Sequence, residues 1–415
     1  LARNMVDGDK DYLLDIKKDL ETEYQRWERT NRLKNGLYWQ GDVQDGMEES
    51  ISGGRRKKYA RPTINSYMYG NAKALSCIGI LSGDEGMAMK YGMRADTLKN
   101  LVENELWNTR HQFFETMRTD SSANVREAIG YIPWYFNLPD TTQKYEIAWK
   151  EIMDEKGFSA PYGLTTAERR HPEFRTRGVG KCEWDGAIWP FASAQTLTAM
   201  ANFMNNYPQT VLSDSVYFRQ MELYVESQYH RGRPYIGEYL DEVTGYWLKG
   251  DQERSRYYNH STFNDLMITG LIGLRPRLDN TIEVNPLIPV DNWDWFCLDN
   301  VLYHGHNLTI LWDKNGDRYH CGKGLRIFVD GKEVGYADTL VKSINEVANS
   351  LQALQKDLND QIASTVDQIN AYAQQIASLN KQIATIEIYG TKANDLRDQR
   401  ATIIDELSAL VDVEV

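Results

Sequence analysis

Residues 36–70 read GLYWQGDVQDGMEESISGGRRKKYARPTINSYMYG. Aromatic side chains open the stretch, and four carboxylates follow within eight residues: Asp42, Asp45, Glu48 and Glu49. A Ser-Gly-Gly turn and the basic run at residues 55–58 lead into a segment that begins a helix. Carboxylates between an aromatic wall and glycines predict the floor of a sugar-binding cleft. The alternative interpretation is an acidic surface loop with a turn.

The size and charge of the chain exclude several classes of protein. With 415 residues the chain is long enough for two or more domains. Its net charge of −12 does not fit the basic surface of a nucleic-acid-binding protein. No apolar run reaches the length of a membrane span. The chain begins at Leu1 without a visible signal peptide, so we expect a fragment whose start, with any export signal, lies outside it.

The cysteines and histidines do not predict a metal site. Cys77, Cys182, Cys297 and Cys321 lie far apart and form neither a CxxC pair nor a zinc spacing. Their expected role is that of small buried residues. The histidines are not paired at ligand spacing, and no EF-hand calcium loop occurs. We therefore expect neither a metal nor a cofactor.

Composition divides the chain near residues 335–340. Every Trp, Pro, Phe, Met, His and Cys residue lies before that point. A single domain rarely divides in this way, so we predict units of different origin. The predicted parts are a helical domain at residues 1–278, a small β-rich region at 279–337 and a helical segment at 338–415.

Apolar periodicity predicts the helices and strands. Ser82 and Gly83 separate two helices and Asp84 caps the second, which predicts an αα-hairpin. Residues 129–136 are aromatic and contain Pro133, so we predict a loop. Asn315-Gly316 and Asp330-Gly331 predict hairpin turns. The predicted helices cover residues 11–29, 64–81, 86–106, 191–205, 214–230 and 262–273, with short pieces at 113–118 and 145–153, and the predicted strands cover 281–284, 295–298, 308–311 and 325–329.

The recurrent order of helix, acidic loop and helix predicts a ring of helical hairpins whose loops build a cleft at one end. Three loops combine Trp or Tyr with Asp or Glu, at residues 39–50, 184–190 and 235–245. Aromatic faces stack on sugar rings, carboxylates bind hydroxyl groups, and two carboxylates can split a glycosidic bond. The loops therefore predict a carbohydrate site.

Four motifs in this region carry a family resemblance: GMEES at residues 46–50, RPTINS at 61–66, WDGAIWP at 184–190 and GEYLDEVTG at 237–245. Residues 1–335 resemble the (α/α)6-barrel, or six-hairpin, glycoside hydrolases. The nearest branch is the mannosylglycerate-hydrolase-like domain, which is related to the processing α-glucosidase and trehalase families. The resemblance implies a mainly α fold, a toroid of helical hairpins truncated at its N-terminus and followed by a small antiparallel β region, and an inverting O-glycosyl hydrolase.

The resemblance also implies roles for individual residues. Glu48 takes the place of the general acid, where the family more often has Asp, and Asp45 is the fallback. Glu238 takes the place of the general base. Other roles stay open for several substrate-binding candidates: Trp184 and Trp189 as core residues, Arg61 and Asn65 as residues that orient the loop, and His260 as a buried histidine. The expected substrate-binding residues are Trp39, Asp42, Arg61, Asn65, Trp184, Asp185, Trp189, Tyr239 and His260.

The tail is a different kind of sequence. Apolar residues from Ile344 to Ile386 recur at a spacing of three or four, which predicts a long coiled-coil helix that ends at Gly390. A second helix is predicted at residues 394–411. The segments 372–383, 394–400 and 405–407 resemble the inner helical domain of the flagellar hook-associated protein at the hook–filament junction. That resemblance implies self-association or flagellar partners, and the alternative is a generic coiled-coil oligomeriser.

Two hypotheses about function follow. The first is a bacterial glycosidase that acts on a carbohydrate, carried by residues 1–335 and located in the periplasm or secreted. The second is a structural or assembly protein of the extracellular flagellum, carried by the tail. We favour the first, and we interpret the combination as a chimeric reading frame, either natural or assembled from mixed DNA.

Overall fold

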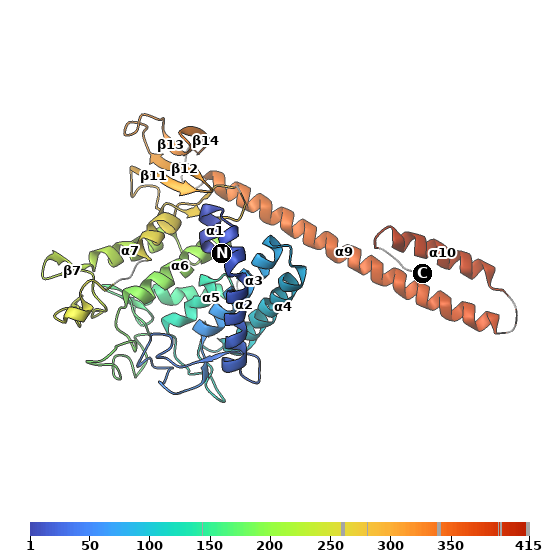
Figure 1. Ribbon diagram of the computed structural model, residues 1–415, viewed down its shortest axis with the longest axis horizontal. Coiled ribbons are helices and arrows are strands. Elements are labelled where there is room, and N and C mark those ends of the chain that lie inside the picture. Colours follow the sequence, from blue (N-terminus) through green and yellow to red (C-terminus); the bar gives the residue numbers. More distant parts are fainter. Residues whose placement is uncertain are drawn as a thin grey trace. The chain divides into compact units, whose positions relative to one another are not determined.

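The computed structural model describes residues 1–142, 144–258, 262–279, 281–337, 342–388, 390 and 392–411. The chain divides into two compact units, Leu1–Val341 and Lys342–Val415. The first unit is rich in helices and carries a small antiparallel sheet, and the second is helical (Figure 1). The expected fold class, mainly α with a small antiparallel β region, is confirmed at this level.

Helices form most of the first unit. The predicted helices at residues 11–29, 64–81, 86–106, 191–205 and 214–230 are confirmed, with ends that differ by a few residues. None of the helices in the described part of the chain is long and apolar enough to cross a membrane. The helices and helical turns are α1 Ala2–Asp7, α2 Asp11–Asn31, α3 Pro62–Leu81, α4 Glu85–Leu101, the π-helical η1 Val102–Leu106, the 3-10 turn η2 Ala128–Tyr131, α5 Ile132–Tyr135, η3 Glu146–Ile152, α6 Pro190–Asn206, α7 Asp214–Glu226, η4 Glu253–Ser255, α8 Phe263–Leu266 and the π-helical η5 Met267–Leu271.

The α3–α4 hairpin follows from its sequence. Pro62 occupies the first turn of α3, where the missing N–H costs nothing. The Asp84 side chain accepts a hydrogen bond from Met87 N at 2.9 Å, which is the predicted cap of α4. The two backbones then approach closely, because a Cβ at Gly79 would lie 2.6 Å from Ala88 N. A glycine at position 79 therefore sets the distance between the helices.

Two predictions within the aromatic core are wrong. The predicted loop at residues 129–136 consists mainly of helical turns, η2 and α5, and Trp134 is fully buried there. The predicted helix at residues 113–118 begins instead as a strand, β4 Phe113–Phe114, paired with β3 Trp107–Asn108. The Trp149 ring contacts both Trp134 and Phe203, with ring centroids 5.3 and 5.1 Å away. Packing between distant segments, rather than local periodicity, determines these short apolar runs.

The strands of the first unit comprise short hairpins and one four-stranded antiparallel sheet in the order β11-β12-β13-β14. Asp330 and Gly331, with φ of 50° and 77°, form the two-residue turn predicted between β13 and β14. The sheet region contacts the helices where the Trp293 ring meets the Phe218 ring of α7 at 5.7 Å. The remaining strands are β1 Trp39–Gln40, β2 Tyr59–Ala60, β5 Ser159–Ala160, β6 Gly163–Leu164, β7 Tyr229–His230, β8 Arg233–Pro234, β9 Leu274–Arg275, β10 Glu283–Val284, β11 Trp295–Tyr303, β12 His306–Asp313, β13 Gly324–Val329 and β14 Lys332–Ala337.

Where the structure describes it, the second unit contains two helices, α9 Lys342–Glu387 and α10 Asn394–Ser408, as the sequence predicts. The shorter helix packs on the longer one, and Leu379, Ile383 and Leu407 are buried. The Arg397 guanidinium donates to both oxygens of the Glu387 carboxylate, at 2.8 and 2.7 Å. The two helices therefore bury part of the apolar stripe against each other.

The close approach of α3 and α4 predicts a difference between two glycines. Gly79→Ala should lower the free energy of unfolding by about 1–3 kcal/mol, because the added methyl group meets backbone atoms of α4. Gly86→Ala, also within a helix, should be neutral or stabilise by up to about 1 kcal/mol, because the nearest atom to its added Cβ is 3.7 Å away. Urea unfolding followed by tryptophan fluorescence measures both. Equal effects of the two variants would contradict the close approach.

Candidate active site

The structure pairs the loops at residues 184–190 and 235–245 through their backbones, and the loop at residues 39–50 packs against them. Ile188 and Leu240 pair through their backbones, and each N–H donates to the other carbonyl at 3.0 Å. Met47 from the first loop joins Trp184, Trp189 and Tyr239 in one buried apolar cluster. Each of the three predicted loops therefore contributes to this cluster.

The motif at residues 237–245 forms a rigid turn. Gly237 is required because a Cβ there would lie 2.2 Å from the Trp247 ring. The Asp241 carboxylate accepts hydrogen bonds from Val243 N at 3.1 Å and from Thr244 N and Oγ1, both at 2.9 Å. Gly245 closes the turn with a φ of 68°. These contacts fix the backbone around Glu238.

Glu238 lies in a buried position with defined partners. The residue as a whole is 6% exposed. Ser255 Oγ donates a hydrogen bond to Glu238 Oε2 at 2.7 Å. Arg254 Nη2 lies 3.9 Å from the same oxygen, on a side chain that is mostly exposed. The hydrogen bond from Ser255 holds the carboxylate in one orientation.

Glu48 and Glu238 share a neighbourhood. Cys182 packs against the apolar cluster that contains Met47 and Tyr239, the chain neighbours of the two carboxylates. Burial raises the pKa of the Cys182 thiol, and the charges of Glu48 and Glu238 raise it further. Burial likewise raises the pKa of Tyr258, with further increases from Glu238 and Glu48. We call the region around these four side chains the candidate active site.

Asp45 and Arg61 form a buried ion pair. The Arg61 side chain is fully buried, and its Nε pairs with Asp45 Oδ2. The same guanidinium donates to Ser52 Oγ at 3.2 Å and to Ser50 Oγ at 3.4 Å. Thr63 Oγ1 donates to Asp45 Oδ2 at 2.8 Å. These contacts favour the interpretation that Arg61 orients the loop, and they engage Oδ2 of Asp45.

Asn65 and Asp185 also bind backbone groups. Asn65 Oδ1 accepts from Tyr38 N at 2.8 Å, and its Nδ2 donates to Tyr38 O at 2.9 Å. Asp185 Oδ2 accepts from Arg177 N at 2.6 Å and from Gly178 N at 3.0 Å. Both side chains are fully buried. Their geometry therefore favours a role in holding loops over direct contact with a sugar.

The remaining polar and aromatic candidates lie in different surroundings. Asp42 is buried and accepts from Val43 N at 2.8 Å. Burial raises the pKa of Asp42, although the charge of Arg61 opposes this effect. Trp39 is half-buried, and the Lys58 ammonium lies 4.6 Å from its ring centroid. His260 lies outside the described residues.

Trp184, Trp189 and Tyr239 form one stack of rings. Trp189 lies between the other two, with centroid distances of 4.0 Å to Trp184 and 4.5 Å to Tyr239. All three residues are buried, and Tyr239 Oη donates to Lys181 O at 2.5 Å. Because both faces of Trp189 are covered by protein, the stack favours a core role for this ring. Whether any of the three contacts a sugar remains a prediction.

Sequence analysis missed Glu127. Its side chain is buried, and burial raises its pKa while the charge of Arg61 lowers it. The Ser52 N–H donates to Glu127 Oε1 at 3.2 Å. Arg61, Glu127 and Trp184 border a cavity of about 10 Å³, which has room for about one water molecule. No periodicity or motif marks Glu127, and the Ser-Gly-Gly pattern at Ser52 predicts an exposed turn rather than a buried hydroxyl group.

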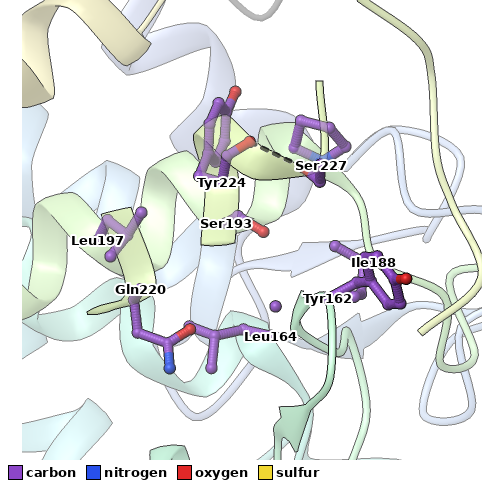
Figure 2. Close-up of a pocket in the computed structure, with 10 residues that line it drawn as sticks. Tyr162, Leu164, Ile188, Ser193, Leu197, Gln220, Tyr224 and Ser227 are labelled. Carbon is purple, nitrogen blue, oxygen red and sulfur yellow. Dashed lines mark hydrogen bonds between the residues drawn. The ribbon is translucent and has the colours of Figure 1, made fainter. Parts of the chain in front are cut away.

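A second small cavity lies behind the loop at residues 184–190. Ile188 lines it together with side chains of α6 and α7, as Figure 2 shows. Ser227 Oγ donates to the Tyr224 carbonyl at 2.7 Å at its edge. No carboxylate occurs among the described residues that line this cavity.

Within the described ranges, no group of three or more His, Cys, Asp or Glu side chains could hold a metal ion.

Two protein families match the first part of the chain. Residues 1–261 match the family described as the mannosylglycerate hydrolase MGH1-like glycoside hydrolase domain. Residues 274–335 match the C-terminal domain of glycosyl hydrolase family 65. The class of protein is therefore a glycoside hydrolase, as the sequence motifs predict. In particular, the chain belongs to the MGH1-like glycoside hydrolase family.

Solved structures are similar to the first unit. A chain that bears the name Sialidase is 94% identical, with a TM-score of 0.81 over 82% of this chain and 31% of that chain. This chain thus spans about a third of that protein. A GH78 family rhamnosidase from Bacillus sp. GL1 is 13% identical, with a TM-score of 0.51 over 79% of this chain and 30% of that chain. The likeness to the rhamnosidase concerns the fold alone.

The tail matches a different group of proteins. Residues 333–415 match the family described as the flagellar hook-associated protein FlgK helical domain. Flagellar hook-associated protein 1 of Bacillus subtilis (strain 168) is 40% identical over 76 residues, which are 18% of this chain and 15% of that protein. The Escherichia coli (strain K12) protein of the same name is 42% identical over 84 residues, 20% of this chain and 15% of that protein. The expected resemblance of the tail is confirmed.

The shared neighbourhood of the two carboxylates can be measured without a substrate. Glu48→Gln and Glu238→Gln should each lower the pKa of Cys182, because removal of a nearby negative charge favours the thiolate. The pKa is read from the pH dependence of alkylation by iodoacetamide, with Cys77, Cys297 and Cys321 replaced by Ser. Glu222→Gln, on α7, is the control and should leave the pKa unchanged. An unchanged pKa in either active-site variant would separate that carboxylate from Cys182.

Proposed function

We propose that the chain cleaves the O-glycosidic bond of an oligosaccharide or glycoside with inversion, with Glu48 as general acid and Glu238 as general base. The observation that carries the proposal is that Met47 and Tyr239, the chain neighbours of the two carboxylates, lie in one buried cluster. The charges of both carboxylates also raise the pKa of Cys182 and of Tyr258. The family of the chain supports the reaction class. The carboxyl groups of inverting glycosidases lie roughly 6.5–9.5 Å apart, and we expect a separation in that range here.

The surroundings of each carboxylate support its role. Glu238 is held by Ser255 in a fixed orientation, which a base that activates one water molecule needs. Glu48 is half-buried, and its chain neighbour Met47 belongs to the buried apolar cluster. Asp45 remains the second candidate for the acid, but its ion pair with Arg61 favours Glu48.

The reaction then follows in one displacement. Glu48 donates its proton to the glycosidic oxygen as the bond from that oxygen to the anomeric carbon breaks. Glu238 takes a proton from water, and the water oxygen forms the new bond to the anomeric carbon from the opposite face. The products are a free sugar of inverted configuration and the leaving alcohol. Proton transfers of this kind contribute about 10²–10⁴-fold each to the rate.

The finer architecture is part of the proposal. We infer an (α/α)6 toroid of helical hairpins at residues 1–278, a small β region at residues 279–337 and a coiled-coil-like helical segment at residues 338–415. The helix-rich first unit and the helical second unit support this division. Trp39, Asp42, Trp184, Tyr239 and His260 remain proposed substrate-binding residues. Asp185 is better explained by its hydrogen bonds to loop backbone groups, and Trp189 by its place inside the ring stack. Arg61 and Asn65 are better explained as residues that hold the loop.

A second function, in assembly, is proposed for the tail. The match of residues 333–415 to a flagellar helical domain favours it. Val366 and Ile386 are exposed on α9, so the tail offers apolar surface to a partner. That partner would be a second copy of the tail or a flagellar helix. The hydrolase part could then be exported or periplasmic, and the tail would belong to the extracellular flagellum.

Substitution of each carboxylate tests the proposed catalysis. Glu48→Gln and Glu238→Gln should each lower kcat by about 10²–10⁴-fold, because each variant loses one proton transfer. The substrates are a panel of oligosaccharides that includes a sialoside, in view of the name of the solved chain at 94% identity. Glu49→Gln is the control, because that carboxylate pairs with exposed Arg55.

Three outcomes would change the assignment. Near wild-type turnover in both active-site variants would reject it. An inactive Asp45→Asn beside an active Glu48→Gln would transfer the acid role to Asp45. Retention of anomeric configuration, observed by proton NMR of the first product, would reject inversion.

Removal of the tail tests the division of roles. A protein that ends at Val341, the last residue of the first unit, should keep the hydrolase activity and lose any self-association of the full chain. Ending at Gly335 would instead cut β14, which pairs with β13. Sedimentation and the activity assay compare the two proteins. Loss of activity in a shortened protein with an unchanged circular dichroism spectrum would assign the tail to the enzyme.

A further inference from the structure

The loop that carries Glu48 is held on both flanks. Asp45 precedes Glu48 by three residues, and Ser50 and Ser52 follow it by two and four. All three side chains contact the Arg61 guanidinium: Nε pairs with Asp45, Nη1 donates to Ser52 Oγ at 3.2 Å and Nη2 donates to Ser50 Oγ at 3.4 Å. The Arg61 side chain, at the start of α3, therefore contacts the loop on both sides of Glu48.

Glu127 holds the same loop from another segment. Its Oε1 accepts a hydrogen bond from Ser52 N at 3.2 Å, and its Oε2 accepts one from the Ser52 hydroxyl group. The Ser52 hydroxyl oxygen also lies 2.9 Å from Thr116 Oγ1. Ser52 is thus bound by a guanidinium from one segment and by a carboxylate from a second.

Burial makes this network difficult to rearrange. Arg61 and Ser52 are fully buried, and Glu127 is 4% exposed. A buried charge that loses its partner is strongly destabilising, so each member of the network requires the others. A cavity of about 10 Å³, with room for about one water molecule, adjoins Arg61 and Glu127. The network therefore allows one arrangement of the loop.

The backbone beside Glu48 needs such support. Glu49 has a φ of 70°, in the left-handed region that is unfavourable for a residue with a side chain. A backbone held in such a conformation persists when its surroundings fix it, and this is frequent at functional sites. The next residue, Ser50, is one of the groups that Arg61 binds. The contact lies directly after the strained residue.

We propose that Arg61 and Glu127 are positioning residues that fix the loop carrying Glu48. The inference rests on the proposed function, in which Glu48 must stay within reach of the glycosidic oxygen. Neither residue touches the sugar, because both are buried and act through the side chains of the loop. Arg61 cannot be replaced by Lys without loss, because a single ammonium group lacks the planar fork that reaches separate oxygens.

The test uses the Cys182 thiol of the full chain as a reporter of Glu48, with the other three cysteines replaced by Ser. Its pKa is measured from the pH dependence of iodoacetamide alkylation. The first variant is Arg61→Lys, which keeps the positive charge and removes the fork. It is measured alone and combined with Glu48→Gln, so that the coupling between the two positions is obtained. Circular dichroism and thermal unfolding verify that each variant is folded.

We expect the effect of Arg61→Lys on the pKa of Cys182 to depend on whether Glu48 is present. Arg61→Lys should lower the pKa of Cys182 by at least half of the decrease that Glu48→Gln causes, because Glu48 then leaves the thiol. In the Glu48→Gln background, Arg61→Lys should have no further effect. An unchanged pKa, or equal shifts in both backgrounds, would overturn the positioning role. If Arg61→Lys does not fold, Glu127→Gln enters the same cycle with the same two criteria.

A control variant and an activity readout complete the test. Glu168→Gln removes a buried carboxylate that pairs with Arg126 at 2.7 Å, and it should not change the pKa of Cys182. On a substrate, Arg61→Lys should lower kcat more than it changes KM. The thiol measurement needs no sugar. A wild-type protein without glycosidase activity would therefore reject the proposed function, and the pKa of Cys182 would still show whether Arg61 positions the loop.

Discussion

Burial of three stacked rings is the constraint on which the candidate active site depends. Trp189 lies between Trp184 and Tyr239, at centroid distances of 4.0 and 4.5 Å. Such ring pairs contribute about 0.5–1.5 kcal/mol each beyond the apolar area that they bury. Because Glu238 precedes Tyr239 in the chain, the stack places this carboxylate by covalent geometry. Met47 in the same cluster places Glu48 in the same way.

The sequence predicted what local patterns determine and missed what distant contacts determine. Helical periodicity located α2, α3, α4, α6 and α7, and Asp330-Gly331 located a hairpin turn. Residues 129–136 were misassigned because Trp134 packs on Phe203, far away in the chain. Residues 113–118 were misassigned because the strand there, Phe113–Phe114, is too short to show a period, although its partner Trp107–Asn108 is near in sequence. Glu48 and Glu238 were proposed as a catalytic pair through motifs, and this assignment stays a prediction. Glu127 was not, since a buried acid that binds a serine leaves no pattern in the sequence.

The aromatic residues illustrate a limit of composition as evidence for a site. Trp and Tyr beside acids indicated a cleft that binds sugars, and the loops that carry them do meet. The rings themselves are largely consumed in packing, with Trp134, Trp149 and Trp247 fully buried and Trp184 and Trp189 nearly so. Large rings therefore report where loops converge more directly than they report which surface contacts a ligand. Exposure decides between these roles, and the sequence does not encode it locally.

The edge of the small sheet has a consequence for the join between the two parts of the chain. The match to the flagellar domain begins at residue 333, inside β14, which closes the sheet at Lys332–Ala337. An edge strand is recognised through its backbone, and Val334 and Tyr336 are exposed there. Exposed side chains at such a position make few packing contacts, so their identity is weakly constrained. Residues 333–335 of this strand belong to both family matches, and their pairing with β13 needs only an extended backbone, so the sequence can change from one family to the other here without loss of the sheet.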